Sequence, residues 1–314
     1  MTLGADVKAL LEHKYALALA GHLIPERLAL ETTNRCNAHC VMCARQGMTR
    51  PLGCMSEDDH IKLLERFGDW RNNIRSISHA GIGDPLMDPT IAQKIKAEKQ
   101  YFPNAKVHLY SNGSLADGPV CDQLLASGLD SLSFSINAFY KDTYESIMGL
   151  KYEKTLCHIL ACIDKRNQSG RSMAINVSMI PQPGLRENEI ADFQAFWKLR
   201  ADQVCLPVLV SWGNYHEAAD EGHDYGLAPC QYLWDVFLLD YNGVVKLCCE
   251  DFNTRHPVGN IYHERAQTLF NSSVMNKLRK RHLDGDFSFE LCRGCSESGH
   301  AALVYWENKA KKQP

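Results

Sequence analysis

The sequence predicts an α/β fold in which a parallel sheet, curved into a partial barrel with helices outside, precedes a smaller cysteine-bearing domain. Two observations predict this fold. Apolar, β-branched runs alternate with helix-like segments over the first part of the chain, which is typical of parallel sheets with crossover helices. The alternation stops near Trp212, and the rest of the chain is irregular and ends its cysteine series in Cys292-Arg-Gly-Cys295.

Six strands and the helices between most of them make up the predicted barrel. The strand runs are 28–33, 74–80, 106–111, 131–136, 174–180 and 204–210. The helix-like segments are 57–67, 90–99, 119–126, 155–166 and 187–200. We divide the chain into an N-terminal extension (1–27) with an amphipathic helix at Val7–Ala20, a barrel (28–212) and a C-terminal domain (213–314). In such sheets, ligands bind at the carboxyl ends of the strands.

The composition is that of a globular protein, with 314 residues, 45% hydrophobic residues, 23% charged residues and a formal net charge of −3. We expect no nucleic-acid partner, because no basic stripe is present, and no membrane association, because no apolar run is long enough for a span. The apolar run at 15–23 lacks the cationic start of a signal peptide. The odd count of 13 cysteines then favours metal or redox chemistry in a reducing cytoplasm.

The first cysteine group is Cys36-x3-Cys40-x2-Cys43, directly after the first predicted strand. Three thiolates in one loop can ligate three irons of a [4Fe–4S] cluster and leave the fourth iron open for a ligand. A structural zinc site would normally take four protein ligands. A zinc knuckle that borrows a distant cysteine is the alternative interpretation.

This motif and its place after the first strand resemble those of the radical S-adenosylmethionine enzymes, over residues 28–212. The resemblance implies a partial (β/α)6 radical SAM barrel, with S-adenosylmethionine held on the open iron through its amino and carboxylate groups. It implies reductive cleavage of S-adenosylmethionine to a 5′-deoxyadenosyl radical, while the protein positions and shields the chemistry. An electron donor such as flavodoxin or ferredoxin is also implied.

Motifs at the strand ends supply the contacts to S-adenosylmethionine that the resemblance implies. Gly81-Ile-Gly83-Asp84-Pro is similar to the family's Gly-Gly-Glu-Pro turn, with Asp84 in place of the usual glutamate. Ser111-Asn112-Gly is similar to its Thr-Asn-Gly. The other candidate contacts are Ser133, Ser135, Asn176 and Met42, the last where the family often has an aromatic residue. The alternatives are turn capping for the small polar residues and ordinary packing for Met42.

A second group of four cysteines lies in the C-terminal domain: Cys230, Cys248, Cys292 and Cys295. Four thiolates make a closed site, which zinc and a second [4Fe–4S] cluster satisfy equally well. Gly243 suits a hairpin that delivers Cys248. The spacing resembles that of the Twitch domain, a shortened SPASM domain, and this implies one auxiliary [4Fe–4S] cluster, so two clusters in all.

Cys249 follows Cys248 directly, and neighbouring side chains in an extended segment point to opposite sides. Cys249 would then lie close to the clusters without being one of their ligands. A thiol there can return a hydrogen atom to a substrate radical, and return to the opposite face inverts the carbon. The alternatives are that Cys248 and Cys249 exchange roles, or that Cys249 is a small buried apolar residue. We expect five other cysteines to be small buried apolar residues of this kind: Cys54, Cys121, Cys157, Cys162 and Cys205.

With this arrangement the chain resembles the radical epimerases of aminoglycoside biosynthesis. The resemblance implies inversion at C5 of the terminal diamino sugar, neomycin C to neomycin B, with Cys249 as the hydrogen donor. Because an aminoglycoside is a polycation, carboxylates should line its pocket, and the candidates are Glu217, Glu250 and Asp251.

Three other functions compete with epimerisation. The first is a radical SAM dehydrogenase of an amino-sugar alcohol, which needs no hydrogen donor. The second is peptide modification, which we do not favour because only about 27 residues precede the first predicted strand, fewer than a leader-binding domain needs. The third is an electron carrier, for which an open iron would be unsuitable.

Overall fold

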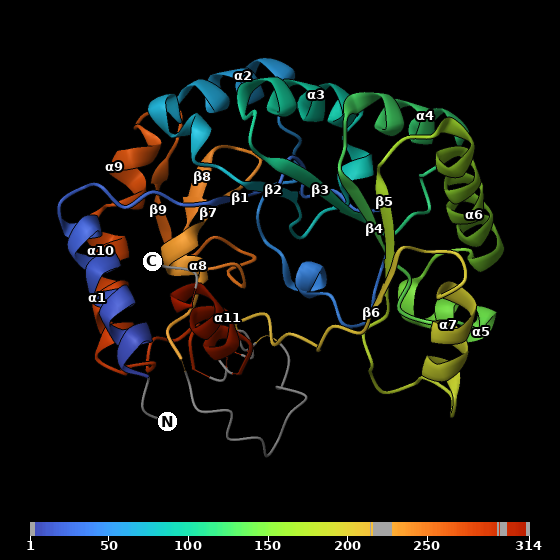
Figure 1. Cartoon of the computed structure of the whole chain (residues 1–314). Helices are drawn as coiled ribbons and strands as arrows, with labels where there is room; N and C mark the ends of the chain where they lie inside the picture. Colours follow the sequence, from blue (N-terminus) through green and yellow to red (C-terminus); the bar gives the residue numbers. More distant parts are fainter. Residues whose placement is uncertain (1–3, 214, 216–227, 294, 296–299, 312–314) are drawn as a thin grey trace.

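The computed structural model describes residues 4–213, 215, 228–293, 295 and 300–311. One nine-stranded sheet runs through these residues in the order β6-β5-β4-β3-β2-β1-β7-β8-β9. It curves into an open barrel whose convex side is covered by an arc of helices, while β7, β8 and β9 extend it beside β1 (Figure 1). The predicted α/β fold with a curved parallel sheet is therefore confirmed.

All six predicted barrel strands are present and parallel to their neighbours. They are β1 Arg27–Leu30, β2 Ser76–His79, β3 Lys106–Ser111, β4 Ser131–Ser135, β5 Ala174–Ser178 and β6 Gln203–Cys205. The last strand is shorter than predicted and stops at Cys205. Pro207 explains the early end, because proline has no N–H with which to continue a ladder.

The predicted helices are also confirmed, and within the barrel one further helix was missed. They are α1 Ala5–Leu19, α2 Glu57–Glu65, α3 Ile91–Tyr101, α4 Gly118–Ser127, α6 Tyr152–Ser169 and α7 Glu189–Trp197. The missed helix is α5 Lys141–Met148, which is too short to show a clear period in the sequence. Side-chain caps start two of the predicted helices: Ser56 accepts a hydrogen bond from the Asp59 N–H, and Asp117 from the Val120 N–H.

The two faces of the barrel sheet differ in composition. Residues such as Leu28, Ile77 and Val107 are fully buried under the helices. The alternate positions, which include Ala29, Ser78 and Ser133, are only partly covered and point to the concave side. These concave positions therefore carry small and mostly polar side chains, which leave room for a ligand.

The C-terminal region continues the barrel sheet. β7 Val236–Leu239 pairs in parallel with β1, and β8 Val244–Lys246 and β9 Pro257–Asn260 follow in antiparallel order. The sequence did not show β7 as part of this sheet, because all four of its residues are buried and no alternation marks a face. The predicted hairpin at Gly243 is confirmed: its φ is +79° and its N–H donates to the Asp240 carbonyl.

The C-terminal part is not irregular as predicted, because it contains helices that the sequence analysis missed, and further short helices lie in the turns of the barrel. They are α8 Tyr232–Asp235, α9 Ala266–Phe270, α10 Ser273–Leu283, α11 His300–Ala310 and the 3-10 helices Ala44–Gly47, Gly68–Asn72 and Pro85–Met87. The N-terminal helix α1 lies beside α10 (Figure 1). The boundary between the barrel (28–212) and the C-terminal domain (213–314) stays a proposal.

Several cysteine predictions were wrong. Cys121 and Cys162 are fully buried, but they form a disulfide between α4 and α6, with 5.7 Å between their Cα atoms. Only the packing of α4 beside α6 brings the two residues together, so the sequence did not show the pair. Cys157 and Cys205 are exposed and Cys54 is partly exposed, so these three are not buried apolar residues.

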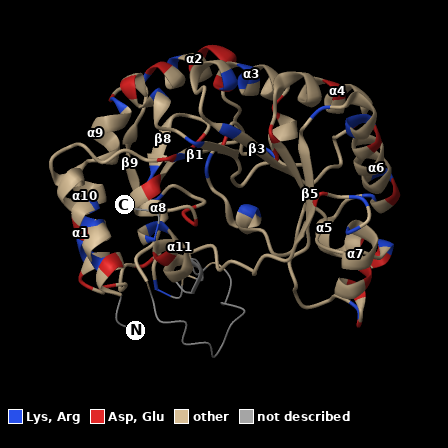
Figure 2. Ribbon diagram, viewed as in Figure 1, with Lys and Arg blue, Asp and Glu red and all other residues tan. Residues whose placement is uncertain are grey.

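Charges of both signs are interspersed over the outer helices (Figure 2). Among the residues described, no helix is both long and apolar enough to cross a membrane.

Candidate functional site

Three of the predicted cofactor contacts, Ser133, Ser135 and Asn176, lie close together on the concave face. Ser133 of β4 pairs with Asn176 of β5 on one side and with Tyr110 of β3, which was not predicted, on the other. The Asn176 amide donates to Ser133 Oγ at 3.2 Å, and Ser135 is the next concave position on β4. Asn176 Oδ1 is buried and has no hydrogen-bond partner among the described residues. An orphaned acceptor here suits a ligand with hydroxyl or amino groups, such as S-adenosylmethionine.

The Cys36–Cys43 loop is held so that backbone N–H groups face its sulfurs. The Ala38 N–H donates to Cys36 Sγ at 3.4 Å, and the Arg45 N–H donates to Cys43 Sγ at 3.5 Å. The middle of the loop is fixed to α5, because the His39 N–H donates to the Met148 carbonyl at 3.0 Å. Donors placed on sulfur stabilise thiolates, which are the form that binds iron.

The three thiols are shielded from water and feel one another's charge. Burial is the largest cause of a raised pKa at all three, and at Cys40 the charges of Cys43 and Cys36 add to it and bring the pKa to about 12. Thiolates so placed need a nearby cation. Among the described residues, no three histidine, cysteine, aspartate or glutamate side chains are arranged so that they could hold one metal ion.

The turn after β2 packs directly on the end of β1. A Cβ added to Gly83 would lie 2.1 Å from the Thr33 carbonyl oxygen, so only glycine fits. A Cβ on Gly81 would lie 2.7 Å from Glu31 Oε2. Both predicted glycines are thus needed for close approach, and Gly81 also lines the barrel cavity.

Asp84 is buried and fully engaged by protein groups. Its carboxylate accepts hydrogen bonds from the Asn112 N–H at 2.7 Å, the Leu86 N–H at 2.9 Å and the Ser111 hydroxyl at 3.0 Å. Burial nevertheless raises the pKa of Asp84. Asp84 therefore joins the turn after β2 to the end of β3.

Asn112 joins the end of β3 to the cysteine loop. Its amide donates to Asn37 Oδ1 at 3.0 Å and lies 3.9 Å from Cys36 Sγ. Met42 is buried in the hydrophobic core, which agrees with its packing alternative.

A cavity of about 330 Å³ opens on the concave side. Its lining includes Gly81, Tyr110, Trp212, Lys246 and Cys249. Cys249 therefore lies on the concave side of the barrel, while the lining of this cavity includes neither the first cysteine loop nor Ser133 and Asn176. Cys248 is not part of this lining.

Cys248 instead belongs with the C-terminal cysteines. Burial, followed by the charge of Cys248, raises the pKa of Cys292 to about 12. The Cys295 N–H donates to the Cys292 carbonyl at 3.2 Å, so these two ligands share one tight turn. Cys230 is tied to the same place, because its N–H donates to His282 Nδ1 at 3.1 Å while His282 Nε2 lies 3.4 Å from Cys292 Sγ. The donor set fits an auxiliary iron–sulfur cluster.

The three carboxylate candidates have different surroundings. Glu250 lines the cavity, but its Oε2 accepts from the Ser211 hydroxyl at 2.9 Å and the Gly213 N–H at 2.7 Å. Asp251 is buried, and its oxygens accept from the backbone N–H groups of Arg255 and His256, which makes it a turn cap. The structure does not bring Asp251 to the cavity lining. Glu217 lies outside the described residues.

A charged network at the carboxyl ends of β1 and β7 was missed by the sequence analysis. Arg50 forms a two-pronged pair with Glu31 and a 2.9 Å ion pair with Asp240. Lys246 lies 3.1 Å from the other Asp240 oxygen, and Glu31 Oε2 accepts from the Ile82 N–H. The only signal in the sequence was a charge directly after each apolar strand, which is also common at turns.

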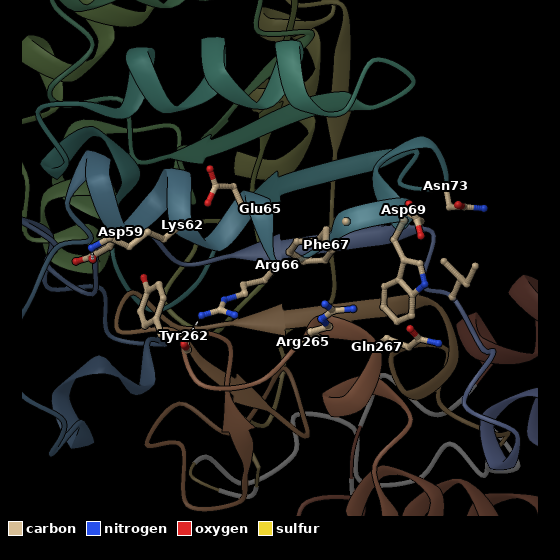
Figure 3. A pocket seen from close by; sticks show the side chains of 13 residues that line it. Asp59, Lys62, Glu65, Arg66, Phe67, Asp69, Asn73, Tyr262, Arg265 and Gln267 are labelled. Atoms are coloured by element: carbon tan, nitrogen blue, oxygen red, sulfur yellow. Dashed lines mark hydrogen bonds and ion pairs between the residues drawn. The ribbon is translucent and has the colours of Figure 1, made fainter.

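A larger cavity of about 960 Å³ lies between α2 and the 262–267 segment (Figure 3). Its rim carries Lys62, Arg66 and Arg265 against Asp59, Glu65 and Asp69. Ile24 and Asn73, which precede β1 and β2, also line it, so it lies at the amino ends of the strands. We assign no catalytic role to it, because the cysteine loop lies at the opposite ends.

Two family models match the chain. The Radical SAM superfamily model matches residues 30–196, which include Cys36, Cys40 and Cys43. The SPASM model, an iron–sulfur cluster-binding domain, matches residues 230–296 and includes all four C-terminal candidates. The matches imply a [4Fe–4S] cluster with S-adenosylmethionine in the barrel and further iron–sulfur binding in the C-terminal domain.

Curated relatives match only in part. A probable GTP 3',8-cyclase of Methanothermobacter thermautotrophicus is 24% identical over 205 residues, 65% of this chain and 64% of that protein. The tungsten-containing aldehyde ferredoxin oxidoreductase cofactor-modifying protein of Pyrococcus furiosus is 29% identical over 137 residues, 43% of this chain and 35% of that protein. The chain therefore spans less than two thirds of the length of these relatives.

Solved structures share the fold. BtrN in complex with AdoMet and 2-DOIA has a TM-score of 0.63 at 16% identity and covers 89% of this chain and 96% of its own. SuiB of Streptococcus suis bound to precursor peptide SuiA has a TM-score of 0.66 at 13% identity, and the match covers 96% of this chain and 77% of the SuiB chain. With its cysteine loop, its barrel and both family matches, the chain belongs to the radical SAM superfamily and carries a C-terminal SPASM iron–sulfur domain.

Proposed function

We propose that the protein is a radical SAM epimerase that inverts a sugar carbon of an aminoglycoside, C5 of the terminal diamino sugar in the conversion of neomycin C to neomycin B. The observation that carries the proposal is the position of Cys249 in the lining of the barrel cavity. Cys248 is not part of that lining: its thiol is hydrogen-bonded to Cys249, and its charge adds to burial in raising the pKa of Cys292. Inversion needs a thiol beside the substrate to return a hydrogen atom, whereas simple dehydrogenation needs no such donor.

The first cluster and S-adenosylmethionine supply a radical that removes one hydrogen atom from the sugar carbon. Cys249 then acts on the opposite face: its S–H bond breaks, and a new C–H bond forms with inverted geometry. The sulfur is left one electron and one proton short of a thiol. A donor such as flavodoxin or ferredoxin, in a reducing cytoplasm, returns the electron, and water supplies the proton.

Among the described residues, the cavity lining carries one carboxylate, Glu250, and two cations, Arg27 and Lys246. Glu31 and Asp240 lie outside the lining and are paired with Arg50 and Lys246. Glu250 is therefore the carboxylate to which we assign contact with an amino group of the substrate. Arg27, at the other end of the cavity, is engaged by Gln231 and lies over the Tyr305 ring.

The second candidate function is a radical SAM dehydrogenase of an amino-sugar alcohol. The similarity to BtrN over most of both chains favours it, although at 16% identity that likeness concerns the fold. In this reaction the substrate radical loses an electron and a proton and becomes a ketone, and Cys249 has no role.

The test is turnover of the reconstituted enzyme with neomycin C in deuterated water. We expect neomycin B that carries one deuterium at C5, because a thiol exchanges its hydrogen with solvent. Mass spectrometry and NMR locate the label. A ketone product without inversion would overturn the epimerase proposal in favour of the dehydrogenase.

Cys205 provides a matched control for Cys249. It pairs with Ser178 in the sheet, and its charge adds to burial in raising the pKa of Tyr110, so it is another thiol on the concave side. We expect Cys249→Ala to keep cleaving S-adenosylmethionine while the yield of inverted product falls at least a hundredfold. Cys205→Ala should keep normal inversion. Equal loss in both variants, or normal yield from Cys249→Ala, would remove Cys249 from the mechanism.

A further inference from the structure

We propose that His282 is a positioning residue of the auxiliary cluster site: it donates a hydrogen bond from Nε2 to Cys292 and thereby raises the reduction potential of the cluster held there. The inference rests on the C-terminal cysteine group and is independent of the epimerase proposal. It would hold equally for a dehydrogenase.

The two hydrogen bonds of the imidazole fix the position of its proton. The Cys230 backbone N–H points at His282 Nδ1 over 3.1 Å, and a backbone N–H can only donate. Nδ1 is therefore the acceptor, and in the neutral ring Nε2 carries the hydrogen. Nε2 lies 3.4 Å from Cys292 Sγ, within hydrogen-bonding distance for sulfur. The bond therefore runs from the imidazole to the sulfur.

The ring has little freedom to turn away. His282 is 1% exposed in the last turn of α10, and Phe287 packs edge-on against it with 4.9 Å between ring centres. One side chain thus connects the backbone of one candidate ligand, Cys230, to the sulfur of another, Cys292.

A hydrogen bond to a ligand sulfur draws electron density away from it. Reduction adds negative charge to the cluster, so the donor stabilises the reduced form more than the oxidised form and raises the potential. Because the site is buried, the effect is weakly screened by solvent.

The chain offers a matched control in His256. Its ring packs edge-on against Phe289 with 5.0 Å between centres, almost the same packing as His282 on Phe287. Its Nε2, however, contacts Glu290. Replacement of His256 tests the loss of a stacked histidine from this domain without the loss of the sulfur contact.

The experiment is a redox titration of the auxiliary cluster by electron paramagnetic resonance. It uses the full chain with Cys36, Cys40 and Cys43 replaced by alanine, reconstituted with iron and sulfide. His282→Gln keeps a donor near the position of Nε2, whereas His282→Asn keeps an acceptor near Nδ1 but loses that donor. His282→Phe loses both.

We expect Asn and Phe to lower the ratio of reduced to oxidised cluster at a fixed potential by about tenfold, which corresponds to a downward shift of about 59 mV for one electron. His282→Gln and His256→Phe should stay near the parent value. Resonance Raman spectra should show altered iron–thiolate stretching in the Asn and Phe variants only.

Two results would overturn the inference: equal potentials in the Gln and Asn variants, or the same shift in His256→Phe. If His282→Phe fails to hold a cluster, the potentials of the Gln and Asn variants decide by themselves: a lower value in Asn than in Gln supports the donor role, whereas equal values contradict it.

Discussion

Single residues at the strand ends set the geometry of the cavity. Gly83 brings the turn after β2 against the Thr33 carbonyl, and Asp84 in the same turn fastens the start of the loop after β3. The Asp84 N–H also donates to the Arg35 carbonyl at 2.8 Å, next to Cys36. The position of the cysteine loop thus depends on a backbone contact that no side chain can replace.

Gly83→Ala tests that contact. The new Cβ would overlap the Thr33 carbonyl and approach Asn34 Cα to 2.8 Å, so the turn must move. We expect the free energy of unfolding to fall by about 1–3 kcal/mol and S-adenosylmethionine binding to weaken. Denaturant unfolding and calorimetric titration measure the two effects.

Gly118→Ala is the control for this substitution. A Cβ there would meet only Lys165 Cε at 3.5 Å, in ordinary contact, and alanine favours the helix at this position. Unchanged binding in Gly83→Ala would show that the turn does not shape the cofactor site.

At the scale of elements, a buried carboxylate connects two helices to a barrel strand. Glu98 of α3 is fully buried and lies 2.8 Å from His60 Nε2 of α2 and 2.8 Å from His79 Nε2 of β2. Burial alone would raise the pKa of Glu98, but the charge of His79 and the hydrogen bonds from both histidines outweigh it and lower the pKa to about 2.

This shift predicts a dependence of stability on pH. Because the unfolded carboxyl takes up its proton near pH 4.5 and the folded one near pH 2, its contribution is complete above the first value. It is lost as the pH falls through this window. Glu98→Gln should therefore be less stable than the parent at neutral pH, and the difference should shrink in acid.

Denaturant unfolding of both cluster-free chains at several pH values measures the difference. Asp59→Asn is the control, since its carboxylate is half-exposed and accepts from the Ser56 hydroxyl and from Lys62, so its contribution should be small. A difference between parent and Glu98→Gln that stays constant with pH would contradict the interpretation.

For the whole molecule, one aspartate joins both terminal helices to the sheet. Asp235, at the end of α8, is fully buried and lies 2.6 Å from Lys14 of α1 and 2.9 Å from Lys309 of α11. Tyr305 of α11 also donates to it. Because β7 begins at the next residue, this contact fastens segments from both ends of the chain to the strand beside β1.

Asp235→Ala should lower the free energy of unfolding by about 3–5 kcal/mol, because it leaves the shielded Lys14 ammonium without its carboxylate and Lys309 with Glu26 alone. Glu12→Ala, which removes an exposed ion pair with Lys8 at 3.9 Å, should cost less than about 1 kcal/mol. Denaturant unfolding of the holoenzyme checks both values. Similar small effects would show that the terminal helices are held by apolar packing alone.

The sequence by itself determined the parts that depend on local pattern. Six strands, the main helices, the cysteine loop and the C-terminal cysteine group all follow from residue type and spacing. Alternation shows one buried face per strand, and closely spaced thiols show a metal site, because both signals lie within a few neighbouring residues.

Only the tertiary structure decided which distant side chains meet. It placed β7 beside β1, closed the Cys121–Cys162 disulfide, assembled the Arg50 network and set His282 against Cys292. It also turned Cys249 toward the cavity and made Asp251 a turn cap. Such contacts join residues far apart in the chain, and their formation depends on how whole elements pack, which local spacing does not encode.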